Sequence, residues 1–317
     1  MTLKILLTRH ETFANEYLSD AVFDGLCELG DVEVTDEPRL WYMYKDGSPG
    51  TGKFKSHTEL HGRGFTMYRL IGDDSHIDRT DIEGKIKSHY FDLCILARSD
   101  FGSPYEDLIL EHYPANKIII ICGKDQDEFK HYRDTTHLIG RGTYFKRELT
   151  FYDPRLQPIP YAFPRQKLIN RPEVQKDKII AGALPIEGGN NNQKYTFTVE
   201  REYYDDYARS FFGPTWKKGG WDCLRHYEII ANKCLPWFTD IHQCPVLTCP
   251  TLPKRELQTI TEMIGHKGYE WFTHGVGLDY YQDMLNKVFE HFINNNLTVH
   301  LAKYVLDTHK RIHDGTL

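Results

Sequence analysis

A predicted helix in the second half of the chain carries an arginine and a glutamate three residues apart. Arg225 and Glu228 therefore share one face of the helix expected over 221–232. Gly219 and Gly220 precede this helix and allow a ligand to come close to the backbone. The first N–H groups of a helix have no partner inside the helix and attract anions such as a diphosphate. The pattern predicts a binding site for a phosphate-bearing ligand.

An arginine beside a carboxylate suits a nucleotide sugar. The guanidinium can bind diphosphate oxygens in a bidentate manner, and the carboxylate can accept hydrogen bonds from a ribose or sugar diol. The structural alternative is an ion pair between Arg225 and Glu228 on the surface of the helix. The spacing alone fits both interpretations.

The basic pair Lys146 and Arg147 lies near the end of a predicted strand over 143–149. Transfer of a group from a diphosphate donor leaves negative charge on the departing nucleotide, and nearby cations stabilise that charge. We therefore expect neither a metal nor another cofactor to be needed. Adjacent residues of a strand point to opposite faces, so we expect one of the two to reach the ligand and the other to stay solvated. A pair that is solvated throughout is the structural alternative.

Transfer with inversion of configuration needs a base that takes the proton of the acceptor hydroxyl. In an open α/β sheet, such residues lie at the C-terminal ends of parallel strands. The candidates, each of which follows a predicted strand, are His10, Glu11, Asp100 and Asp125. Each also suits a turn or a cap, and an enzyme that retains configuration needs no such base.

The elements that must position these residues alternate between apolar strands and helices, which is typical of a parallel sheet buried on both faces. In the first half, strands are predicted over 4–8, 32–34, 91–97, 117–122 and 143–149, with helices over 15–29 and 105–112. A proline-rich stretch then marks a boundary near residue 165. Beyond it, strands are predicted over 178–184, 211–216 and 235–239, with helices over 200–210 and 221–232.

We therefore predict an α/β protein with two Rossmann-like domains that face a central cleft. The first domain covers 1–165 and is expected to bind the acceptor, and the second covers 166–279 and is expected to bind the donor. Helices over 280–317, with a break near 294–296, are expected to pack back toward the first domain.

The amino-acid composition argues against several classes of protein. The chain has 317 residues, a net charge of −6 and no apolar run long enough to span a bilayer, so we expect a cytoplasmic protein without a membrane span. Seven scattered cysteines, with no Cys-x-x-Cys pair, favour reduced thiols over disulfides or a zinc site. The acidic balance argues against nucleic-acid binding over the whole surface but is compatible with a local basic groove.

The segment from Gly219 to Pro236, followed by Asp240 and Pro245, resembles a block found in glycosyltransferases with two Rossmann-like domains, the GT-B class. The block contains an arginine, a glutamate three residues later, a small residue, a cysteine, a proline, and then an aspartate and a proline. The resemblance is closest to exostosin-like and spore-maturation-type members. In those proteins the matching arginine and glutamate contact the nucleotide-sugar donor, which implies this role for Arg225 and Glu228.

Two other segments extend the resemblance. Residues 117–125 are similar to a strand that ends in an Asp-Gly-x-Asp turn, although Cys122 replaces the first aspartate, and residues 144–161 are similar to the basic segment and proline-rich return that close the first domain. The three segments together span about 117–250. The predicted donor-binding residues are Lys146, Arg147, Gly219, Gly220, Arg225, Tyr227 and Glu228.

The resemblance implies a glycosyltransferase that moves a sugar from a nucleotide sugar to an acceptor hydroxyl on a glycan, a small molecule or modified DNA. One alternative is an enzyme that glycosylates hydroxymethylated bases in viral DNA. That enzyme would need a basic groove in the first half, to which Lys45, Lys53, Lys55, Arg63 and Arg69 could contribute. The other alternative is a module that binds a nucleotide sugar without catalysis.

Overall fold

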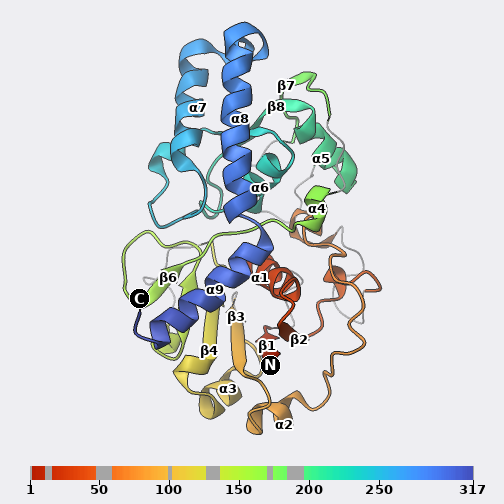
Figure 1. Cartoon of the computed structure of the whole chain (residues 1–317), viewed down its shortest axis with the longest axis vertical. Coiled ribbons are helices and arrows are strands. Elements are labelled where there is room, and N and C mark those ends of the chain that lie inside the picture. The colour runs from red at the N-terminus through yellow and green to blue at the C-terminus, as the bar shows by residue number, and fades with distance from the viewer. Residues whose placement is uncertain are drawn as a thin grey trace.

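The structure is a computed structural model of the whole chain. It describes residues 2–10, 16–47, 59–98, 102–125, 136–169, 174–183 and 196–316. Within these ranges the strands form two separate parallel sheets, one of six strands and one of three. Figure 1 shows the larger sheet toward one end of the long axis and the smaller sheet toward the other.

The first sheet has the strand order β2-β1-β3-β4-β5-β6, and every neighbouring pair is parallel. Its strands are β1 (Leu3–Thr8), β2 (Val32–Glu37), β3 (Leu93–Arg98), β4 (Ile118–Cys122), β5 (Thr143–Lys146) and β6 (Leu156–Pro158). The order reverses direction between β1 and β3, which is the point where open α/β sheets bind ligands at their C-terminal edge.

The two faces of the first sheet are covered by different helices. Ile119 and Ile121 of β4 pack in the hydrophobic core that includes α1 (Tyr17–Cys27), whereas Ile118 and Ile120 pack in the core that includes α2 (Ile82–Lys87) and α3 (Glu106–His112). This alternation follows from the two-residue period of a strand. An isoleucine run is therefore what a strand buried on both faces requires.

The second sheet has the order β7-β8-β9, again with parallel pairs. Its strands are β7 (Lys178–Ile180), β8 (Ser210–Thr215) and β9 (Leu235–Phe238), and the helices of this half are α5 (Glu200–Ala208), α6 (Leu224–Ala231) and α7 (Lys254–Lys267). Helix α6 lies close against β8, because a Cβ atom on Gly213 would be 2.7 Å from Cγ2 of Ile229. The glycine thus allows β8 to pack closely against the second half of α6.

The chain ends in two long helices, α8 (Gly275–Asn295) and α9 (Thr298–His313), and a short helix, α4 (Gln166–Ile169), follows the first sheet. Helix α8 packs against α6, whereas α9 returns to the first sheet and packs against α1 (Figure 1). The hydroxyl of Thr298 donates to Oδ2 of Asp24 at 2.7 Å across this contact. The predicted break in the terminal helix is confirmed at residues 296 and 297.

The prediction of an α/β fold with a parallel, Rossmann-like sheet is confirmed. The sequence analysis missed β6, α2 and α7, and it started α6 three residues too early, because the backbone of residues 221–222 binds a carboxylate instead of continuing the helix. Across the ranges given above, no helix has both the length and the apolar character needed to cross a membrane.

Candidate anion-binding site

Arg225 is the second residue of α6, and its guanidinium is partly buried at the start of that helix. Its Nη1 atom is inaccessible to solvent and has no hydrogen-bond partner among the described residues. Burying a cation without a partner is costly, so such a group usually has a ligand or a counter-ion. Arg225 is therefore the part of this helix that most needs an anion.

Lys218 lies on the loop that joins β8 to α6, upstream of Arg225. The loop turns tightly here, because the Lys218 N–H donates to the Gly220 carbonyl at 3.1 Å. Burial, together with the positive charge of Arg225, lowers the pKa of the Lys218 ammonium. The Asp125 carboxylate acts on Lys218 in the opposite sense. The sequence analysis missed Lys218, although its position directly before the two glycines is a signal that could have found it.

The first turn of α6 adds a third positive feature. Cys223 occupies the N-cap position and makes no side-chain hydrogen bond to the helix backbone. The amides of the first turn have no side-chain cap, as in α3, α5, α7, α8 and α9, and the positive end of the helix dipole lies beside Arg225. A diphosphate or another anion would complement this combination of charges.

Arg147 is also buried, but it is fully partnered. Its Nε donates to the Gly123 carbonyl at 2.9 Å, its Nη2 pairs with Asp125, and its Nη1 donates to Glu148 at 3.2 Å. Nη1 also donates to the backbone carbonyl of Asp222, across the junction between the two halves of the chain. Arg147 is therefore committed to holding the structure together.

The prediction that either Lys146 or Arg147 stays solvated is wrong. Lys146 is 4% exposed and Arg147 is 1% exposed. The reason is that the segment after β5 does not end at the surface but runs under the loop 219–222 of the second half, where the Arg147 guanidinium finds its partners.

Gly219 and Gly220 do allow the close approach that the sequence predicts, but carboxylates of the first half make it. A Cβ atom on Gly219 would clash with the Asp125 carboxylate, and one on Gly220 would clash with Glu148. Glu148 accepts hydrogen bonds from the N–H groups of Trp221 at 2.9 Å and of Asp222 at 2.8 Å. The anion in this turn is thus a side chain of the protein itself.

Tyr227 is fully buried, and its hydroxyl donates to Oδ1 of Asp222 at 2.9 Å. The other oxygen of Asp222 accepts from the Tyr161 N–H at 2.9 Å. Burial raises the pKa of the Asp222 carboxyl, and the charge of Arg147 opposes this effect. The structure thus places Tyr227 in the junction between the two halves.

Glu228 is buried, and among the described residues its carboxylate accepts hydrogen bonds from two hydroxyl groups. Thr66 of the first half donates to Oε1, and Tyr203 of α5 donates to Oε2 at 2.6 Å. Burial raises the pKa of the Glu228 carboxyl. No ion pair joins Arg225 to Glu228, although the structure describes both residues, so the interpretation of a surface ion pair is wrong.

Two candidates for the acceptor base lie within the described residues. The side chain of Asp125 is 60% exposed, pairs with Arg147 and lies beside Gly219, two of the residues predicted to bind a donor. His10 is partly buried and follows β1. The other two candidates, Glu11 and Asp100, lie outside the described residues.

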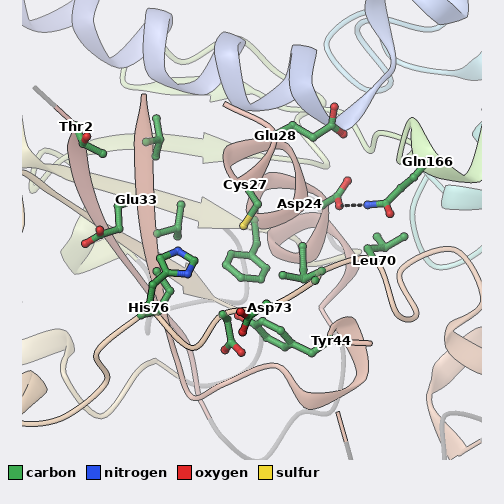
Figure 2. Close-up of a pocket in the computed structure, with 17 residues that line it drawn as sticks. Thr2, Asp24, Cys27, Glu28, Glu33, Tyr44, Leu70, Asp73, His76 and Gln166 are labelled. Atoms are coloured by element: carbon green, nitrogen blue, oxygen red, sulfur yellow. Dashed lines mark hydrogen bonds between the residues drawn. The ribbon is translucent and has the colours of Figure 1, made fainter. Parts of the chain in front are cut away.

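A cavity of about 430 Å³ lies elsewhere, between α1, β2 and the segment 70–77 (Figure 2). Its carboxylates are Asp24, Glu28, Glu33, Asp73 and Asp74, and its lining includes neither lysine nor arginine. Burial raises the pKa of Asp24 to about 7. This electrostatic character is opposite to that of the first turn of α6, so the cavity does not suit a phosphate-bearing ligand.

The described residues contain no group of three or more His, Cys, Asp or Glu side chains that could hold a metal ion. All seven cysteines are free thiols. The chain was also compared with family models, with curated proteins and with solved structures, and none of them matches it.

Proposed function

We propose that the protein is a glycosyltransferase that takes a sugar from a nucleotide-sugar donor and needs no metal. The observation that carries the proposal is the Arg225 guanidinium, whose buried Nη1 has no partner among the described residues. A diphosphate would supply the missing acceptors and the missing negative charge. The resemblance of residues 219–245 to the donor-binding block of GT-B enzymes supports the same assignment.

Glu228 supports the sugar half of the proposed donor. Its carboxylate already accepts from two hydroxyl groups, those of Thr66 and Tyr203. A ribose or sugar diol presents the same pair of donors, and in the proposed complex it takes the place of the Thr66 hydroxyl. Because Arg225 and Glu228 share one face of α6, one ligand can reach both.

Asp125 is the proposed base for an inverting reaction. The acceptor oxygen attacks the anomeric carbon, the bond from that carbon to the diphosphate breaks with its electron pair staying on the phosphate oxygen, and the acceptor proton passes to Asp125. The partial exposure of Asp125 and its contact with Gly219 support this role. The proposal thus includes the GT-B arrangement, with the acceptor on the first half and the donor on the second.

A binding screen tests the proposal. Thermal unfolding is followed with a panel of nucleotide sugars, for the natural protein and for Arg225→Gln, and transfer or hydrolysis is assayed with any donor that binds. Arg201→Gln on α5 is the control, because that side chain is 87% exposed. We expect at least one nucleotide sugar to raise the melting temperature of the natural protein and of the control, but not of Arg225→Gln. Failure of the whole panel, or equal binding by Arg225→Gln, would refute the donor site.

A second candidate function is a module that binds the nucleotide sugar without catalysis. The observation in its favour is that Asp125, the proposed base, is already paired with Arg147. Binding without transfer or hydrolysis, over a broad panel of acceptors, would select this function over the enzyme.

A further inference from the structure

Two of the seven free cysteines, Cys244 and Cys249, flank one tight turn. The turn covers residues 245–248, because the Thr248 N–H donates to the Pro245 carbonyl at 3.2 Å. Such a turn brings its first and last Cα atoms within about 7 Å of each other. The sulfur of Cys244 also lies 3.9 Å from the Thr248 carbonyl oxygen, beside the peptide bond that leads into Cys249. The fold therefore holds two thiols next to each other, although the sequence has no Cys-x-x-Cys pair.

The turn is fixed in place by a lysine and is open to solvent at its tip. The Lys254 ammonium donates to the carbonyl of Pro245 at 2.7 Å and to that of Val246 at 3.1 Å, and Val246 is 87% exposed. Cys244 is partly exposed, whereas Cys249 is fully buried. A small solute can therefore reach the first sulfur but not the second.

The two thiols also differ in acidity. Cys249 donates a hydrogen bond to the Cys244 sulfur, which lowers the pKa of Cys244; burial opposes this effect, and the charge of Lys254 adds to it. Burial raises the pKa of Cys249. The thiolate, and not the thiol, attacks an oxidant, and an accessible acidic cysteine beside a second cysteine is typical of redox-sensitive sites. Cys244 is therefore the thiol that reacts first, and Cys249 is the partner that can resolve the product.

We propose that Cys244 and Cys249 form a reversible disulfide when the protein meets hydrogen peroxide. The Cys244 thiolate attacks one peroxide oxygen, the O–O bond breaks, and the leaving hydroxide takes up the thiol proton to form water. The Cys249 sulfur then attacks the sulfur of the sulfenic acid, the S–O bond breaks, and the second hydroxide leaves as water with the Cys249 proton. Two thiols are thus oxidised and one peroxide is reduced. This proposal does not depend on the proposed function.

Oxidation of this pair changes a hydrogen bond at the junction between the two halves. In the reduced protein, the Cys249 thiol can donate its proton to the Asp222 carboxylate instead of to Cys244. The same carboxylate accepts from the Tyr161 N–H at 2.9 Å and from the Tyr227 hydroxyl at 2.9 Å. A disulfide sulfur has no proton to donate, so the oxidised protein leaves Asp222 with one donor fewer.

The test is peptide mapping of the natural protein after exposure to hydrogen peroxide and without a reducing agent. Trypsin releases residues 234–254 as one peptide, because the only lysine or arginine in this range is the last residue. We expect this peptide to lose the mass of two hydrogen atoms and to regain it after reduction with dithiothreitol. The matched control is Cys234→Ala, which removes the third cysteine of the same peptide and should leave the mass loss unchanged.

Two further variants test the order of the steps. In Cys249→Ser, Cys244 should stop at the sulfenic acid, which dimedone traps, and in Cys244→Ser, Cys249 should stay reduced because it is buried. Thermal unfolding of the reduced variants checks their fold, and the natural protein with its Cys234→Ala control decides the proposal even if a variant does not fold. The proposal is refuted if the natural peptide keeps its mass while free glutathione in the same solution is oxidised. It is refuted equally if Cys234→Ala abolishes the mass loss, or if Cys244→Ser or Cys249→Ser retains it.

Discussion

Two arginines near one loop, Arg147 and Arg225, differ in how their charge is satisfied. Arg147 is 1% exposed and donates to carboxylates and carbonyls from both halves of the chain. Arg225 lies in the first turn of α6, and its buried Nη1 has no partner among the described residues. A satisfied cation holds a structure together, whereas an unsatisfied one is in place for a ligand.

The backbone amides in and after the loop 219–222 show the same contrast between groups with and without a side-chain partner. The turn of this loop, which the sequence suggests as a phosphate site, is already filled by the Glu148 carboxylate. The next amides, at the start of α6, have no side-chain cap. The site proposed for an anion therefore begins at Leu224, four residues after Gly220 in the chain.

The largest expected effect on stability comes from substitution of Arg147, the arginine with partners in both halves of the chain. Arg147→Met should lower the free energy of unfolding by about 3–5 kcal/mol, because it leaves the carboxylates of Glu148 and Asp222 buried without their cation. Chemical denaturation measures this change. Arg155→Met is the control, because Arg155 pairs with Asp153 at the surface and should contribute less than about 1 kcal/mol. Equal effects of the two substitutions would mean that the junction does not depend on Arg147.

Substitution of Arg225 should not lower the free energy of unfolding in this way. Arg225→Met removes a guanidinium that makes no ion pair with a described carboxylate and interacts with Glu228 only at longer range, so the free energy of unfolding should change much less than in Arg147→Met. Pyrophosphate at a hundred times its dissociation constant should stabilise the natural protein by about 2.7 kcal/mol and should not stabilise the variant. A large loss of stability in Arg225→Met without ligand would place Arg225 with Arg147 as a structural residue.

The sequence predicted the strands and the helix that carry these residues, but it did not predict that Arg147 and Arg225 differ in their hydrogen-bond partners. Alternating apolar runs such as Ile118–Cys122 identify buried strands, because the period of burial is a local property. The spacing of Arg225 and Glu228 likewise identifies a shared helix face. Nothing local distinguishes Arg147 from Arg225, because the partner carbonyl of Arg147 is on Asp222, 75 positions away in the chain. Lys218 was missed although its position directly before Gly219 and Gly220 is visible in the sequence.

A third prediction concerns the buried carboxylate of Asp24 and the pH dependence of stability. Asp24 accepts from the Thr298 hydroxyl and from the Gln166 amide, and burial raises its pKa from 3.8 to about 7. The folded protein therefore binds this proton more tightly than the unfolded chain does, so the contribution of Asp24 to stability falls as the pH rises from about 4 to 7. Asp24→Asn should remove this dependence, whose slope for one group is at most about 1.4 kcal/mol per pH unit.

Denaturation at pH 5, 6, 7 and 8 measures the slope for Asp24→Asn and for the control Asp307→Asn, which changes an exposed residue of α9. Asp20, whose pKa is also raised to about 7 by burial, stays in both variants and gives the same background. Identical slopes for the two variants would mean that Asp24 is not protonated more readily in the folded protein.

The smallest expected effect concerns Thr66, the residue of the first half whose hydroxyl is hydrogen-bonded to Glu228. Thr66→Val keeps the shape of the side chain but removes the hydroxyl that donates to Oε1 of Glu228. Tyr203 still donates to the other oxygen, so the loss of stability should be about 1 kcal/mol. Thr66→Ser keeps the hydroxyl and is the matched control.

The same substitution shows whether Glu228 binds the ligand or serves only the contact between the two halves. If a ligand hydroxyl must displace Thr66, then Thr66→Val frees the carboxylate oxygen in advance and should raise the affinity for the nucleotide sugar, by about threefold to tenfold for one neutral hydrogen bond. Titration calorimetry measures this change against Thr66→Ser. A lower affinity in Thr66→Val would mean that Thr66 holds Glu228 in position for the ligand. An unchanged affinity would mean that Glu228, like Arg147, serves the contact between the two halves and does not bind the donor.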